Sequence, residues 1–227
     1  MKTVTIPVYQ FSELSEKARE RAAELLRNHT ADHHWWDATY DDADNIATLL
    51  GITIDRASVL TKSGRRESGL PDIQFSGFWS QGDGASFVGS FSSKGGCDTA
   101  IRSYAPLDEK LLAIARSLDT LHTQLSNRLS ATLTRRRDAY HHYSHENTVD
   151  INVMLTDSHG DERTASAEVE DELGNVLRSF MRWIYGQLES EYDHLTSDDY
   201  LAEYANENGY WFDDRGHESS RFLSAQH

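Results

Sequence analysis

The sequence predicts an α+β fold, in which an antiparallel sheet is covered by two long helices and accompanied by further helices near the N-terminus. Residues 108–129 and 165–195 place apolar side chains at helical spacing, which predicts the two long helices. Residues 72–92 alternate between apolar and polar side chains around a Gly-Asp-Gly turn, which predicts a β-hairpin. Because no linker or low-complexity tract interrupts the chain, we expect 1–227 to form a single domain with a flexible tail of about twelve residues.

Local patterns predict the other elements. Ser12 or Ser15 can cap the first helix, Gly51 suits the end of the second, and Pro7 restricts the first strand to a sheet edge. In chain order, we expect a strand in 1–11, helices at 12–28 and 35–50, a strand at 52–54, a loop at 62–71, strands at 130–140 and 149–155, a turn at 156–161, a helix at 197–206 and a strand at 210–212. The expected sheet contains 72–78, 85–92, 131–140 and 149–155. The expected core includes Trp36, Phe75, Phe87, Leu118, Phe180 and Ile184.

The charge balance restricts the classes of partner. The chain has 22 Lys and Arg against 37 Asp and Glu, a formal net charge of -15. This charge argues against binding to nucleic acid or to an anionic membrane, and it favours a basic protein partner. The single cysteine, Cys97, cannot form an internal disulfide, and the sequence has neither a bilayer-spanning apolar run nor a secretory signal. We therefore expect a cytoplasmic protein.

The most distinctive segment is FSGFWSQGDGASF, residues 75–87. Its two turn glycines allow positive φ, so that backbone amides near Asp83 can face a ligand, and Asp83 itself can act as an acid or base. The candidate ligand-binding residues here are Ser80, Gln81, Gly82, Asp83 and Gly84. The alternative is a hairpin turn without any ligand, and the spacing of a Walker phosphate loop is absent.

A second polar segment, RRRDAYHHYSH, covers residues 135–145 and is the main basic island of the chain. Arg137 is a further candidate ligand-binding residue, and His142 and His145 join Asp83 as candidate catalytic residues. We expect the Asp83 turn to lie near at least one of these three side chains. Solvated or structural histidines are the alternative. The spacing predicts no metal site and no cofactor, and Cys97 has no recognisable base partner.

The C-terminal third is strongly acidic. Between residues 161 and 214 there are fifteen Asp and Glu against three Arg. Glu168, Glu172, Glu189 and Asp193 can form an anionic strip on one helix, and we take them as candidate partner-binding residues. Such a strip can imitate the phosphates of nucleic acid, or it can be an ordinary solvated face.

Five segments of the chain are distinctive when taken together: WWDATYDDADNIATLLGI, FSGFWSQGDGASF, YAPLDEKLLAIA, YHHYSH and LRSFMRWIYGQLESEYDHLTSD. In this order they resemble a family of uncharacterised phage and prophage proteins that are loosely labelled antitoxin-like. The similarity extends over roughly residues 12–212, and the second of these segments is the most specific. The resemblance implies a phage or mobile-element setting and supplies no catalytic residue.

Two functions remain open at this point. The first is a non-enzymatic inhibitor that binds a basic host protein of a nucleic-acid-directed defence, of the anti-CRISPR or anti-restriction type, through the acidic surface. The second is a small-ligand-binding protein or enzyme with a polar site around 80–86 and 135–145. A structural or assembly factor of the phage is a third interpretation, and a homodimer is compatible with each of them.

Overall fold

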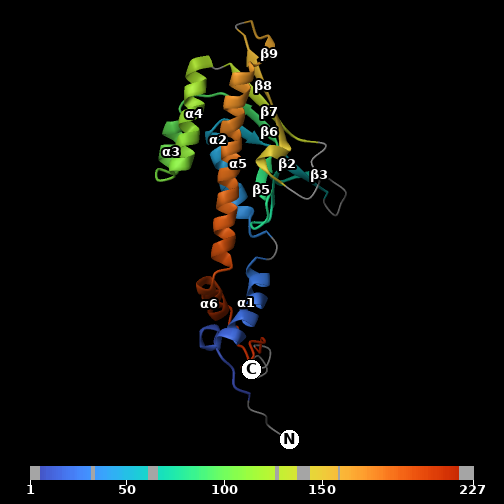
Figure 1. Cartoon of the computed structure of the whole chain (residues 1–227), viewed down its shortest axis with the longest axis vertical. Coiled ribbons are helices and arrows are strands. Elements are labelled where there is room, and N and C mark those ends of the chain that lie inside the picture. The colour runs from blue at the N-terminus through green and yellow to red at the C-terminus, as the bar shows by residue number, and fades with distance from the viewer. Residues whose placement is uncertain are drawn as a thin grey trace. The chain divides into compact units, whose positions relative to one another are not determined.

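A computed structural model describes residues 6–31, 34–60, 66–125, 128–136, 144–157 and 159–219. The chain divides into two compact units (Figure 1). We call Asp37–Glu189 the core unit, and Met1–Trp36 with Ser190–His227 the terminal unit. The prediction of a single domain stays a prediction, because compact units of one chain can fold together or separately.

The core unit contains the five-stranded sheet of the protein. Its strands are β1 (Ile52–Ile54), β6 (Gly89–Ser92), β7 (Leu129–Arg135), β8 (Val149–Thr156) and β9 (Glu162–Thr164), in the order β1-β6-β7-β8-β9. Every neighbouring pair is antiparallel. The predicted α+β class with an antiparallel sheet is confirmed.

Side chains of this sheet alternate between the core and solvent. On β7, Leu129, Ala131 and Leu133 are buried, whereas Thr132 and Thr134 are exposed. The sheet therefore buries one face and leaves the other in contact with solvent, as antiparallel sheets often do.

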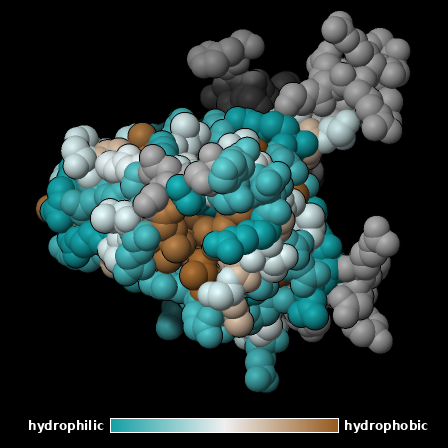
Figure 2. All heavy atoms as spheres, turned by 90° about the horizontal axis from the view of Figure 1, so that it is seen from above, coloured by the Kyte–Doolittle hydropathy of each residue, from teal (hydrophilic) through white to brown (hydrophobic). Residues whose placement is uncertain are grey.

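On the face of the molecule seen from above, apolar residues lie in a hollow surrounded by hydrophilic residues (Figure 2).

The hairpin does not join this sheet as predicted. Strands β4 (Ile73–Ser76) and β5 (Gly84–Phe87) form a separate two-stranded sheet, so the placement of 72–78 in the main sheet is wrong. The predicted strand 85–92 is divided at Val88, next to Gly89, whose φ of 152° suits glycine alone. A Cβ there would lie 2.0 Å from the carbonyl oxygen of Thr53.

A third sheet pairs β2 (Arg56–Leu60) with β3 (Arg66–Pro71). The prediction of a loop over 62–71 is therefore wrong for 66–71. Gly69 and Pro71 are unfavourable in a central strand, but they are tolerated in a strand that pairs on one side only. The predicted strand 130–140 ends at Arg135, and its last residues, 137–140, lie outside the described residues.

Most predicted helices are confirmed within a few residues. They are η1 and α1 (Phe11–Glu13 and Glu16–Thr30), α2 (Asp37–Leu49), α4 (Glu109–Leu125), α5 (Ala167–Leu195) and α6 (Asp198–Glu207). Helix α3 (Cys97–Tyr104) was not predicted. Asp119 of α4 accepts hydrogen bonds from the Cys97 and Asp98 amides, at 3.0 and 2.9 Å, so the first turn of α3 is capped from another helix.

The predicted core is confirmed in part. Phe87, Phe180 and Ile184 are fully buried, and Leu118 is nearly so. Phe87 and Phe180 meet edge to face, with ring centroids 5.9 Å apart, and thereby join the hairpin to α5. The expected burial of Trp36 and Phe75 is wrong, because both side chains are only half-buried.

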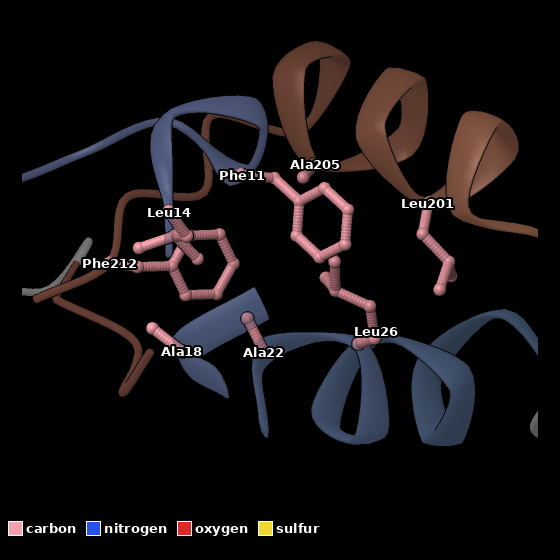
Figure 3. Packing of buried hydrophobic residues seen from close by; sticks show 9 residues of the cluster. Phe11, Leu14, Ala18, Ala22, Leu26, Leu201, Ala205 and Phe212 are labelled. Carbon is pink, nitrogen blue, oxygen red and sulfur yellow. The ribbon is translucent and has the colours of Figure 1, made fainter. Parts of the chain in front are cut away.

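The terminal unit has a small core of its own (Figure 3). Helices α1 and α6 pack with the segment around Phe212, and the buried residues are Phe11, Leu14, Ala18, Ala22, Ala23, Leu26, Leu201, Ala205 and Phe212. Tyr9 and Phe212 exchange both backbone hydrogen bonds, at 2.8 and 2.9 Å. The strands predicted in 1–11 and at 210–212 are therefore reduced, within the described residues, to this isolated bridge and a bridge between Phe212 and Glu218.

Cys97 gives a prediction about reactivity and pH. Its side chain is fully buried, and burial, followed by the charge of Asp119, raises the pKa of its thiol to about 11. We expect a thiol-specific reagent at pH 8 to modify Cys97 slowly in the folded protein and rapidly in denaturant. Between about pH 9 and 11 the unfolded thiol loses its proton before the folded one, so stability should fall as the pH rises. Rapid modification under native conditions would contradict this burial.

Candidate functional site

The hairpin loop between β4 and β5 is organised by Asp83. Its Oδ2 accepts hydrogen bonds from the backbone amides of Trp79 and Ser80, at 3.0 and 2.7 Å. A Cβ at Gly77 would lie 2.9 Å from the same oxygen, so glycine lets the carboxylate approach the chain there. Gly82 adopts a φ of 101°. The carboxylate predicted as an acid or base thus holds the loop closed.

Aromatic side chains fix the loop to α5. Phe78 stacks on Phe75, at a centroid distance of 5.8 Å, and lies against Tyr185, at 5.6 Å. The Tyr185 hydroxyl donates a hydrogen bond to the Gly77 carbonyl oxygen at 3.1 Å. Burial, with smaller effects from Glu189 and Asp83, raises the pKa of Tyr185 and keeps this hydroxyl a donor. Trp79 projects from the anchored loop with 79% of its surface exposed.

The predicted meeting of the hairpin turn with the histidine segment is confirmed at one point. His145 lies directly against Gly84, where a Cβ would come within 2.9 Å of the imidazole Cδ2. The Ser76 hydroxyl also lies 3.2 Å from both the backbone N and the backbone O of Ser144. Arg137 and His142, the other two predicted partners, lie outside the described residues.

His145 belongs to a small polar network that the sequence did not reveal. Its Nδ1 lies 3.2 Å from the Asn147 amide and 3.1 Å from Oε2 of Glu146. The first contact requires Nδ1 without a proton, and the second becomes an ion pair only when Nδ1 carries one. Glu146 is buried and also pairs with Arg182 of α5, at 3.0 Å. No periodic signal links Glu146 to Arg182, which is 36 residues away in the chain.

The strand-end arginines have structural partners. Arg135 forms a two-pronged ion pair with Asp72, with nitrogen–oxygen distances of 2.7 and 3.1 Å, and so ties β7 to the start of β4. Arg136 lies 3.5 Å from Asp150. Ser80 and Gln81 are exposed on the loop.

The contacts described above make this loop a braced one. The described residues include no group of three or more His, Cys, Asp or Glu side chains placed to hold a metal ion. The Asp83 carboxylate accepts a hydrogen bond from the Ser80 amide, and the His145 imidazole accepts one from the Asn147 amide. The indole of Trp79 is exposed on this braced loop. Exposed Trp side chains are frequent anchors of protein interfaces.

The candidate partner-binding carboxylates belong to two different units. Glu168 and Glu172 are exposed on the first turns of α5, Glu189 is half-buried, and Asp193 is exposed in the terminal unit. The backbone amide of Glu168 and the Ser166 hydroxyl hold the pKa of the Glu168 carboxyl below its usual value, so it stays charged at neutral pH.

Within the described part of the chain, no helix is long and apolar enough to cross a membrane.

The fold and the site together define an α+β protein. Its antiparallel sheet is buried on one face, and its braced hairpin loop exposes a tryptophan. A family model described as a domain of unknown function, DUF8835, matches residues 35–198. The chain belongs to this DUF8835 family. The match includes the whole core unit and leaves most of the terminal unit outside. No curated protein and no solved structure matches the chain.

Proposed function

We propose that the protein is a non-catalytic binding protein that occupies the basic, nucleic-acid-binding surface of a host protein. A nucleic-acid-directed defence system of the CRISPR or restriction type is the partner class that we favour, because the chain resembles phage and prophage proteins. The cytoplasm, where such systems act, is the compartment we propose. The observation that carries the proposal is the exposure of the carboxylates at one edge of the sheet.

We name this surface the acidic edge. It consists of the exposed Asp161, Glu162, Glu168, Asp171 and Glu172, from the residue before β9, from β9 and from the start of α5. Strand β9 is the last strand of the sheet, and Arg163 is the single cation between Asp161 and Glu172. Closely spaced carboxylates attract a basic groove over about a Debye length and speed the encounter. The same charges also discourage pairing of this edge with a second sheet.

The rival function is a small-ligand site or an active site at the hairpin loop. The contact of Gly84 with His145 favours it, since that contact brings together two of the polar segments. The use of the Asp83 carboxylate by the loop backbone disfavours it. The two functions differ in which residues matter: Asp83→Ala should abolish function in the rival, and changes in the acidic edge should not.

The test is charge reversal. We expect Glu168→Lys, Asp171→Lys and Glu172→Lys, combined in one variant, to slow association with the partner captured from host lysate by about tenfold or more. Added duplex DNA should release the captured partner from the wild-type protein. The wild-type protein itself should give no shift of DNA or RNA in a mobility assay at low salt, because its net charge is -15.

The matched control variant combines Glu20→Lys, Glu24→Lys and Glu207→Lys. These three exposed residues lie in the terminal unit, and their reversal changes the net charge by the same amount. The control should retain capture. If both variants lost association with the partner equally, the effect would come from net charge and not from the acidic edge. Tight binding of the wild-type protein to nucleic acid would exclude the proposal.

A further inference from the structure

Helices α4 and α5 enclose a groove that no part of the proposed function uses. Its volume is about 420 Å³, within the range of about 300–1,000 Å³ that small-molecule sites occupy. The apolar part of its lining consists of Ala113 and Ile114 of α4 with Val176 and Trp183 of α5. With the polar lining residues included, the lining recurs every three or four residues on each helix: Lys110, Ala113 or Ile114, and Ser117 on α4, and Val176, Ser179, and Arg182 or Trp183 on α5. This spacing keeps the lining on one face of each helix.

The charges along this groove are opposite to those of the protein as a whole. Lys110 and Arg182 line it, and among its described lining residues there is no carboxylate. Arg182 is already paired with Glu146. Lys110 is exposed and has no ion-pair partner among the described residues, so it supplies the available positive charge. In a chain with a net charge of -15, the positive charges of this lining favour an anion over a cation.

The wall of the groove is rigid. Trp183 donates a hydrogen bond from Nε1 to Oδ2 of Asp108 at 2.7 Å, and its ring stacks on Phe180 at 5.8 Å with an interplanar angle of 9°. Asp108 also accepts from the Leu111 amide at 2.9 Å, which fixes the carboxylate at the start of α4. Trp183 and Lys110 also line a second hollow of about 690 Å³, whose lining includes Leu107 and the carboxylates Asp108 and Glu109. A ligand therefore meets a preformed surface and loses little affinity to reordering.

We propose that the α4–α5 groove binds a small amphipathic anion. The apolar body of the ligand lies against Ile114, Val176 and Trp183, and its acidic head group lies at Lys110. The chemical class is an alkyl or aryl carboxylate with a volume smaller than that of the groove. This site and the acidic edge consist of different residues, so either proposal can fail without the other.

The experiment uses three probes that share one alkyl chain and differ in head-group charge: decanoate, decanol and decyltrimethylammonium. We expect isothermal titration calorimetry on the full chain to show decanoate binding about tenfold more tightly than decanol, and the cation more weakly than both. Lys110→Glu should weaken decanoate about tenfold and leave decanol nearly unchanged. Ala113→Trp, at an exposed position, should fill the groove and abolish binding of both.

The matched control is Lys17→Glu, which makes the same charge change at an exposed lysine of the terminal unit. It should leave decanoate binding unchanged, and melting curves should show that all three variants are folded. Equal affinity for the three head groups would overturn the proposal, as would binding that survives Ala113→Trp. Absence of decanoate binding would also overturn it, in favour of a groove that takes a helix of a partner protein.

Discussion

Phe180→Ala is expected to lower the free energy of unfolding by about 3–5 kcal/mol. Phe180 is fully buried in the core unit, with its ring against Phe87 of the hairpin and against Trp183 of its own helix. Loss of the ring removes apolar burial and leaves a cavity that two rigid neighbours cannot fill. Urea denaturation monitored by circular dichroism measures the change.

The control for this substitution is Leu107→Ala, at a leucine that is 91% exposed. Its removal should change the free energy of unfolding by less than about 0.5 kcal/mol. A Phe180→Ala protein with an unchanged midpoint would show that the ring does not belong to the core, and the packing of the hairpin on α5 would then be wrong.

Gly89→Ala is expected to destabilise the core unit by about 3–5 kcal/mol, through backbone strain added to a steric clash. The new Cβ would lie 2.0 Å from the carbonyl oxygen of Thr53 and 3.1 Å from the Cα of Ile54, both on the neighbouring strand β1. Backbone atoms of a paired strand cannot move aside without breaking the β1–β6 ladder. Hydrogen exchange should therefore show faster exchange of the amides of 52–54 and 89–92 in the variant.

Gly96→Ala separates the two causes. Gly96 also has a positive φ, of 83°, but a Cβ there meets no atom within 4 Å. This control variant should cost only the backbone strain of about 1–2 kcal/mol. Equal destabilisation by the two substitutions would mean that the clash with β1 contributes nothing to the free energy lost in Gly89→Ala.

The helices could be predicted from the sequence because their signal is local. The apolar stripes of α4 and α5 are long enough to determine both the type and the approximate ends of these elements. Helix α3 has eight residues, and the cap at its start comes from Asp119, 21 residues beyond Asp98 in the chain. A pattern read within one segment cannot contain such a partner.

The partition of strands among sheets could not be predicted for a related reason. Alternation in 72–92 indicates strands, but it does not show that the chain passes from one sheet to another next to Gly89, where the backbone approaches Thr53 closely. The candidate site could likewise be predicted only in part. The polar composition of 75–87 pointed to a turn and to a contact with His145, whereas the use of Asp83 by the loop amides depends on the folded loop.

The terminal unit has a consequence for biosynthesis, because its small core joins residues from two distant parts of the chain. Phe11, Leu14 and Leu26 pack against Leu201 and Phe212. Some 175 residues separate Leu26 from Leu201, and a ribosome adding about 5–20 residues per second needs roughly 10–35 s to make them. During that interval the amphipathic helix α1 has left the exit tunnel without its apolar partners, while the residues of the core unit are still being made. We therefore expect chaperones to bind helix α1 of the nascent chain before Leu201 and Phe212 have been made.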